Sequence, residues 1–232
     1  MFEYWASAFN STYLLFFIPA IILSLYAQMK VNSTYHKFEQ VKSRRGVTAA
    51  QVARAILDKH GLYDVSVGMI PGKLTDHYNP QTKQLNLSQA TFQSTSVAAI
   101  GVAAHEAGHA VQHAEGYVPL KLRSFFVPIA GIGSNMAIPL VILGLIFSSM
   151  SFLIDVGIIL FSVVVAFYII TLPVEFNASS RAIEVLDAGA FLDADEISGA
   201  KKVLSAAALT YLAAAAVALA NLIRLLALRR DD

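Results

Sequence analysis

The chain has 232 residues, of which 56% are hydrophobic and 14% are charged, and its mean hydropathy is +0.58. Soluble domains carry about a quarter charged residues, so this composition is typical of a membrane protein. The net charge of +1 excludes the strongly basic character that is typical of proteins that bind nucleic acid. Because the chain has no cysteine, disulfide bonds and thiolate metal sites are also excluded, and any metal ion must be bound by histidine or carboxylate side chains.

Four apolar stretches are long enough to cross a bilayer as helices. The first covers residues 9–27, and because no Lys or Arg precedes it, we interpret it as an uncleaved anchor and not as a signal peptide. The other three cover residues 125–150, 152–172 and 203–226. We therefore expect an integral membrane protein of mainly α class, with about four transmembrane helices in a single domain over residues 1–232.

Two polar sections, residues 30–123 and 173–202, separate these stretches. In the first, Thr48 and Gln51 form a capping-box pattern, which predicts a helix that ends near Lys59. Residues 65–70 predict a short strand, and residues 74–78 and 84–88 predict a β-hairpin. The sequence therefore predicts a small sheet immediately before the next helix.

That next helix, predicted over residues 97–114, contains the motif His-Glu-x-x-His at residues 105–109. Positions i and i+4 share one face of a helix, so His105 and His109 can bind the same metal ion. The carboxylate of Glu106, beside the first ligand, can reach a water molecule on that ion. This arrangement is the signature of zinc hydrolases. The alternative interpretation is a buried helix with two structural histidines, but the apolar residues around the motif favour a metal as their partner.

Catalytic zinc uses three protein ligands and leaves one position open, so a third ligand is needed. Glu115 lies ten residues after His105, the spacing of metzincins. That pattern requires a glycine seven residues after the first histidine, where the chain turns back, and Gln112 occupies this position. The sequence therefore disfavours Glu115 as a ligand.

Two further glutamates lie in the second polar section. Glu175 closely follows Pro173, which predicts the start of a new helix just beyond the third apolar stretch and on the same membrane side as the motif. Glu184 lies deeper in that helix and has the spacing of an ion pair with Arg181. Glu175 is therefore the favoured third ligand, with Glu184 as a weaker candidate.

We expect the other ionisable residues near the motif and the spans to have structural roles and not to bind metal. Asp76 and His77 lie on the predicted hairpin, where turn or supporting roles are favoured over metal binding. His113 is one helical turn beyond His109, which is too far along the axis for a third ligand on a straight helix. Asp155 is expected at the membrane interface, although an intramembrane proton relay is the alternative.

Three segments carry a family resemblance: Leu-Thr-Asp-His-Tyr at residues 74–78, Ala-Ala-His-Glu-Ala-Gly-His-Ala-Val-Gln at 103–112, and Leu-Pro-Val-Glu-Phe-Asn-Ala-Ser-Ser-Arg-Ala at 172–182. They resemble the YugP-type membrane zinc metallopeptidases, with a match from Thr48 to Arg181. They are more distantly similar to the HtpX and CAAX-prenyl gluzincin proteases, which have an aspartate where this chain has Ser179. The resemblance implies a gluzincin-like core with three zinc ligands and one general base: His105, His109 and Glu175, and Glu106.

The expected activity is a zinc-dependent endopeptidase that acts near the membrane surface on peptide bonds of membrane-associated or misfolded proteins. Zinc would lower the pKa of its bound water to about 7, and Glu106 would accept the proton and pass it to the leaving amine. Candidates for stabilising the oxyanion are Arg181, His77 and Tyr78. The alternatives are an intramembrane protease of the site-two type and a non-catalytic scaffold or transporter with a vestigial zinc site.

The distribution of Lys and Arg predicts the orientation, since cytoplasmic loops carry the excess of these residues. The excess places both polar sections in the cytoplasm, although the basic residues near the C-terminus disagree. We therefore expect a protein of the bacterial inner membrane, with the lipid bilayer as a partner and the site on the cytoplasmic side. The basic residues on the motif side are Lys30, Lys37, Lys42, Arg44, Arg45, Lys121, Arg123, Lys201 and Lys202; those near the C-terminus are Arg224, Arg229 and Arg230.

Overall fold

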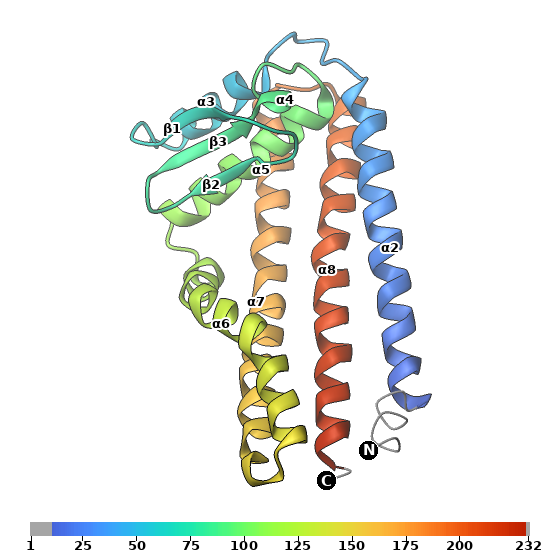
Figure 1. Ribbon diagram of the computed structural model, residues 1–232. Coiled ribbons are helices and arrows are strands. Elements are labelled where there is room, and N and C mark those ends of the chain that lie inside the picture. Colours follow the sequence, from blue (N-terminus) through green and yellow to red (C-terminus); the bar gives the residue numbers. More distant parts are fainter. Residues whose placement is uncertain (1–10, 231–232) are drawn as a thin grey trace. The chain divides into compact units, whose positions relative to one another are not determined.

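The computed structural model describes residues 11–230, so residues 9 and 10 of the predicted first span lie outside the described residues. It shows a mainly helical fold with a small sheet (Figure 1). In chain order the elements are α2 (Ser11–Glu39), α3 (Ala49–Lys59), β1 (Ser66–Ile70), β2 (His77–Asn79), β3 (Gln84–Ser88), α4 (Gln89–Phe92), α5 (Val97–Ala114), α6 (Val118–Ile146), a 3-10 helix (Ser148–Met150), α7 (Phe152–Ala188) and α8 (Ala194–Arg230).

Within the described residues, four helices are long and apolar enough to cross a membrane. These candidate spans are Leu14–Glu39, Val118–Ile146, Phe152–Ala188 and Ala194–Arg229. The first two overlap most of the predicted stretches 9–27 and 125–150, and the last two contain the stretches 152–172 and 203–226, which confirms the expected fold class. All four helices extend beyond those stretches at one end or both, where the helical backbone continues into the neighbouring polar sequence.

The helix expected to start at Pro173 does not exist as a separate element, so this prediction was wrong. α7 is continuous from Phe152 to Ala188, and Pro173 lies inside it. Proline removes one backbone donor, but neighbouring side chains and helices can satisfy the freed carbonyl group in long apolar helices. Glu175 therefore lies well inside a long helix and not in a first turn.

The chain divides into two compact units, which in the described residues comprise residues 29–120 with 173–209, and residues 11–28 with 121–172 and 210–230. We refer to them as the motif unit and the span unit. The motif unit contains the sheet, α3, α4, α5 and the adjoining parts of α7 and α8. Long helices contribute to both units because the unit boundaries fall inside α2, α6, α7 and α8.

The sheet of the motif unit has the strand order β1-β3-β2. β1 is parallel to β3, and β2 is antiparallel to β3 with Tyr78 opposite Leu85. The predicted hairpin is therefore confirmed, although its first strand covers His77–Asn79 and not residues 74–78. Since β3 is the central strand, β2 is an edge strand.

The helices α3 and α5 begin where local sequence signals place them. Thr48 and Gln51 form the reciprocal hydrogen bonds of a capping box at the start of α3. Ser96 caps α5 by accepting a hydrogen bond from the backbone of Ala99, and Gly116 follows the helix with a φ of 67°. α5 spans the predicted residues 97–114, and its apolar residues pack with α3, β3 and α7 in the core of the motif unit.

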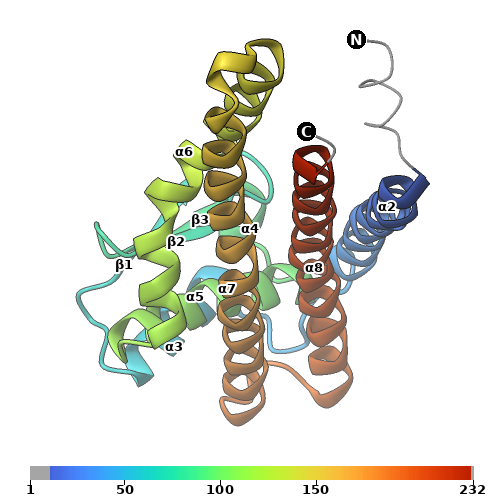
Figure 2. The same cartoon turned by 90° about the horizontal axis from the view of Figure 1, so that it is seen from below.

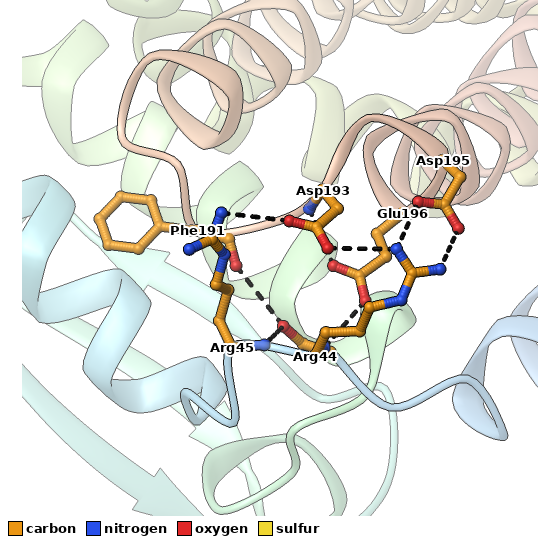
Figure 3. A network of polar contacts seen from close by, with 7 residues as sticks. Arg44, Arg45, Phe191, Asp193, Asp195 and Glu196 are labelled. Atoms are coloured by element: carbon orange, nitrogen blue, oxygen red, sulfur yellow. Dashed lines mark hydrogen bonds and ion pairs between the residues drawn. The ribbon is translucent and has the colours of Figure 1, made fainter.

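A polar network holds the segment before α3 against the start of α8 (Figure 3). The guanidinium of Arg44 contacts the carboxylates of Asp193 and Asp195 at 3.1 and 2.6 Å. The backbone N–H of Arg44 donates to the carboxylate of Glu196. Arg45 contacts the second oxygen of Asp193 at 3.2 Å. This network joins residues distant in sequence within the motif unit, so it fixes the segments that flank its core.

In the span unit, α6 and α7 lie side by side where a short turn joins them, as both views show (Figure 1, Figure 2). Gly133 permits close contact, because a Cβ there would lie 2.7 Å from the carbonyl oxygen of Leu160. Asp155, in the first turn of α7, forms an exposed ion pair with Arg229 at 2.7 Å. This pairing is typical of a structural contact at a helix end and gives no support to a proton relay through Asp155.

Candidate metal centre

The two histidines of the motif lie on one face of α5, as their spacing predicts. Their rings have centroids 4.7 Å apart and are nearly perpendicular, at 83°. His109 is 9% exposed, and the alanines around the motif are fully or almost fully buried. Burial of two imidazoles in an apolar helix requires polar partners, which the structure supplies from α7.

Glu175 of α7 provides the carboxylate that faces both histidines. Its Oε2 lies 3.2 Å from His105 Nε2 and 3.6 Å from His109 Nε2, and the residue is 2% exposed. The structure does not bring the other two glutamate candidates to this point. Glu115 forms an ion pair with Arg181 at 2.7 Å, and Glu184 is exposed.

The ion pair expected between Arg181 and Glu184 is not the one that forms. Arg181 instead contacts Glu115 at 2.7 Å and donates through Nε to the side-chain oxygen of Asn177 at 2.8 Å. The prediction failed because it considered only partners on the same helix, whereas α5 ends beside α7. The Arg181 contact lowers the pKa of the Glu115 carboxyl, mainly through its hydrogen bond.

A close approach between α5 and α7 brings Glu175 into place. A Cβ at Gly108 would lie only 2.9 Å from the carbonyl oxygen of Ala178, closer than real side-chain contacts allow. Gly108 lies next to His109, and Ala178 lies next to Ser179. The glycine in the middle of the motif therefore lets the helices that carry His105, His109 and Glu175 meet.

Both histidines direct Nε2 toward Glu175 and use Nδ1 for another contact. The Nδ1 of His105 lies 3.1 Å from the hydroxyl of Ser179, and the Nδ1 of His109 lies 3.0 Å from Oε1 of Gln112. Ser179 therefore supports the His105 ring through a hydroxyl group. Polar support of this kind fixes the orientation of histidines that bind metals.

Glu106 is adjacent to His105 but is not part of the group formed by His105, His109 and Glu175. Its Oε2 accepts a hydrogen bond of 3.1 Å from the backbone N–H of Tyr78 in β2. Burial raises the pKa of the Glu106 carboxyl, and the nearby His109 and His105 oppose part of this shift. An anchored carboxyl with a raised pKa is suited to accepting and returning a proton.

The remaining polar residues near the sheet have the structural contacts that the sequence favoured. His77 contacts the Thr75 carbonyl through Nδ1 at 2.9 Å, and Asp76 accepts hydrogen bonds from the backbone and hydroxyl of Ser88. His113 lies 2.9 Å from the Tyr78 hydroxyl through Nδ1. Among the three candidates for oxyanion stabilisation, Tyr78 is the one whose backbone contacts Glu106.

The three side chains His105, His109 and Glu175 fit a zinc ion by donor type and by distance. One donor atom from each lies within 4.8 Å of the others. In a tetrahedral site with bonds of about 2.0–2.2 Å, neighbouring ligand atoms lie about 3.3–3.6 Å apart. The two measured separations from Glu175, 3.2 and 3.6 Å, are close to that range. The group could therefore bind zinc with little rearrangement.

Comparison with known proteins decides the family. A family model described as "Putative neutral zinc metallopeptidase" matches residues 13–230. The chain belongs to this metallopeptidase family. A relative from Bacillus subtilis (strain 168), described as "Putative membrane protease YugP", is 48% identical over 207 residues, which are 89% of this chain and 92% of the relative. No solved structure matches the chain.

Membership in the zinc metallopeptidase family confirms the resemblance seen in the sequence. The family name implies zinc, and the name of the relative implies a membrane protease, in agreement with the four apolar helices of residues 11–230. Sequence reasoning missed Gln112 and Asn177, which complete the polar surroundings of the histidines. Gln112 had a signal in the sequence, since a glutamine in an apolar helix three residues after His109 lies near the same face of that helix.

Proposed function

We propose that this chain is a zinc-dependent membrane endopeptidase in which His105, His109 and Glu175 bind the metal ion. The observation that carries the proposal is the convergence of these three side chains from α5 and α7, with Glu106 anchored beside them. The family and its membrane protease relative support hydrolysis of peptide bonds. The expected substrates are membrane-associated or misfolded proteins.

A zinc ion held by these side chains would supply a Lewis acid for a water molecule and for the carbonyl group of the scissile peptide bond. Glu106 acts as the general base and general acid. It accepts a proton from the attacking water and returns it to the departing amine. The hydrogen bond from the Tyr78 backbone keeps the carboxylate of Glu106 oriented during both transfers.

The edge strand β2 offers a place for an extended substrate. The N–H of Tyr78 is directed toward Glu106 and not into the ladder with β3. Alternate residues of an antiparallel edge strand present their N–H and C=O groups outward, where a peptide can pair with them unless they are already bonded, as the Tyr78 N–H is to Glu106. A substrate paired with β2 would run past the general base.

The proposal is tested by Glu106→Gln, with the exposed Glu184→Gln on α7 as the matched control. Glu106→Gln should retain zinc and fold but reduce cleavage of an unfolded-protein substrate by about 10²–10⁴-fold, since general acid–base catalysis contributes about that much. Glu184→Gln should cleave at the wild-type rate. Cleavage by Glu106→Gln at the wild-type rate would contradict the mechanism.

We also propose that the motif unit faces the cytoplasm, on the basis of its Lys and Arg excess. The chain lacks cysteine, so single cysteines report topology directly. Tyr63→Cys, at a position 76% exposed, should resist a membrane-impermeant maleimide in intact cells and react after lysis. Ser149→Cys in the exposed turn between α6 and α7 should react in intact cells. The reverse pattern would invert the topology.

A further inference from the structure

Gln112 is a fully buried polar residue that belongs neither to the ligand set nor to the general base. It lies one helical turn after His109 on α5 and is 0% exposed. Its amide has three polar contacts: Oε1 with His109 Nδ1 at 3.0 Å, and Nε2 with the Val174 carbonyl and with Asn177 Oδ1, both at 2.9 Å. A buried amide with all these contacts satisfied is a specific arrangement, because an unmade contact there is costly.

The backbone carbonyl of Val174 determines the direction of this network. A carbonyl oxygen can only accept, so the amide group that faces it must be the NH₂ of Gln112. The amide oxygen must then face His109, and it can only accept as well. His109 therefore donates from Nδ1–H. In the neutral imidazole this places the lone pair on Nε2, the nitrogen that faces Glu175 and that a metal ion would bind.

The two groups that accept hydrogen bonds from the Gln112 amide lie on either side of Glu175 in the sequence. Val174 and Asn177 flank Glu175 on α7, and the Asn177 oxygen accepts a second hydrogen bond from Arg181 Nε at 2.8 Å. Gln112 thus contacts one ligand directly and also holds the helical turn that carries another. The orientation of His109 and the position of Glu175 are set by the same side chain.

His105 differs from His109 in this respect. Its Nδ1 faces the Ser179 hydroxyl, which can either donate or accept a hydrogen bond. The contact supports the ring but does not dictate which nitrogen carries the proton. Of the two histidines, His109 is therefore the one whose Nδ1 must carry a proton.

We propose that Gln112 is the positioning residue that fixes the Nε2-binding tautomer and ring orientation of His109, with its amide held by Val174 and Asn177. The inference rests on the metal site of the proposed function, but it does not depend on hydrolysis. Partners of this kind contribute about 10- to 100-fold to metal affinity.

The first test is histidine-selective ¹⁵N NMR of the wild-type protein in detergent with stoichiometric zinc. His109 should show zinc on Nε2 and a proton on Nδ1. Zinc on Nδ1 of His109 would overturn the proposal. Because this measurement needs no substitution in the network, it remains decisive even if variants fold poorly.

The second test measures zinc affinity by competition with a chelator. Gln112→Leu should bind zinc about 10- to 100-fold more weakly. Gln112→Glu retains an acceptor for His109 but loses the N–H groups that face Val174 and Asn177, so it should recover only part of this loss. Ser88→Ala removes buried contacts to Asp76 and Thr91 elsewhere in the motif unit, so it is a control for general loosening and should bind zinc normally.

The outcomes separate this inference from the proposed function. Wild-type affinity in a folded Gln112→Leu variant, or an equal loss in Ser88→Ala, would overturn the role of Gln112 while leaving the metal site intact. An equal loss in Gln112→Glu and Gln112→Leu would also overturn it. A wild-type protein that binds zinc but cleaves nothing would contradict the proposed function alone.

Discussion

In both the motif unit and the span unit, a glycine lets two helices pack closely, but the surroundings of the two contacts differ. In the motif unit, Gly108 lets α5 approach the carbonyl of Ala178 on α7, and in the span unit Gly133 lets α6 approach the carbonyl of Leu160. The first contact lies among buried polar residues that face one another. Buried residues near the second are mainly apolar. Close helix packing alone therefore provides stability, and chemistry arises only where hydrogen-bonded polar side chains line the contact.

This difference predicts that Gly108→Ala affects both stability and metal binding. The new Cβ would lie 2.9 Å from a backbone oxygen, so α7 must shift beside Ser179 and Glu175. Overpacking costs about 1–3 kcal/mol, which exceeds the helix propensity gained by alanine. We expect a destabilised protein whose zinc affinity is about tenfold weaker or worse, as when supporting groups of a metal site are displaced.

The matched control for Gly108→Ala is Gly101→Ala on the same helix. A Cβ there would contact Ala200 at 3.4 Å, an ordinary contact distance. Thermal unfolding in detergent and zinc titration of the two variants test the comparison. Normal zinc affinity in Gly108→Ala would show that the close approach does not position the ligands.

The smaller effect is expected from Gly133→Ala in the span unit. Its Cβ would lie 2.7 Å from the Leu160 carbonyl oxygen and 2.9 Å from a methyl group of Val164. We expect a net loss of about 1–2 kcal/mol after the gain in helix propensity, with zinc affinity unchanged. Gly131→Ala is the control, because a Cβ at that position meets nothing within 4 Å. A change in zinc affinity in Gly133→Ala alone would remove the distinction between the two regions.

Local signals in the sequence predicted the elements of the motif unit well. The helix over residues 97–114 follows from an N-cap at Ser96 and a glycine at 116, and both act on their immediate neighbours. The capping box of α3 and the β2–β3 hairpin are local features of the same kind. The two candidate ligands on α5, His105 and His109, could be predicted because a four-residue spacing alone places them on one face.

Contacts between segments that are distant in the sequence were harder to predict. Glu175 was favoured from its position and from the family resemblance, but no local rule brings residues 105 and 175 together. Gln112 contacts Val174 and Asn177, which lie 62 and 65 positions further along the chain. These contacts therefore depend on how closely α5 and α7 pack. Pro173 was misinterpreted because a strong local signal for a helix start was overridden in a long apolar helix.

The central claim is that Glu175, and not Glu115, completes a zinc site with His105 and His109. Mass spectrometry of purified, natively folded protein measures it directly as zinc per chain. Wild-type protein and Glu115→Ala should each carry one zinc ion, because Glu115 is half exposed and contacts Arg181. Glu175→Ala should lose the metal. Retention of zinc in Glu175→Ala together with its loss in Glu115→Ala would contradict the account.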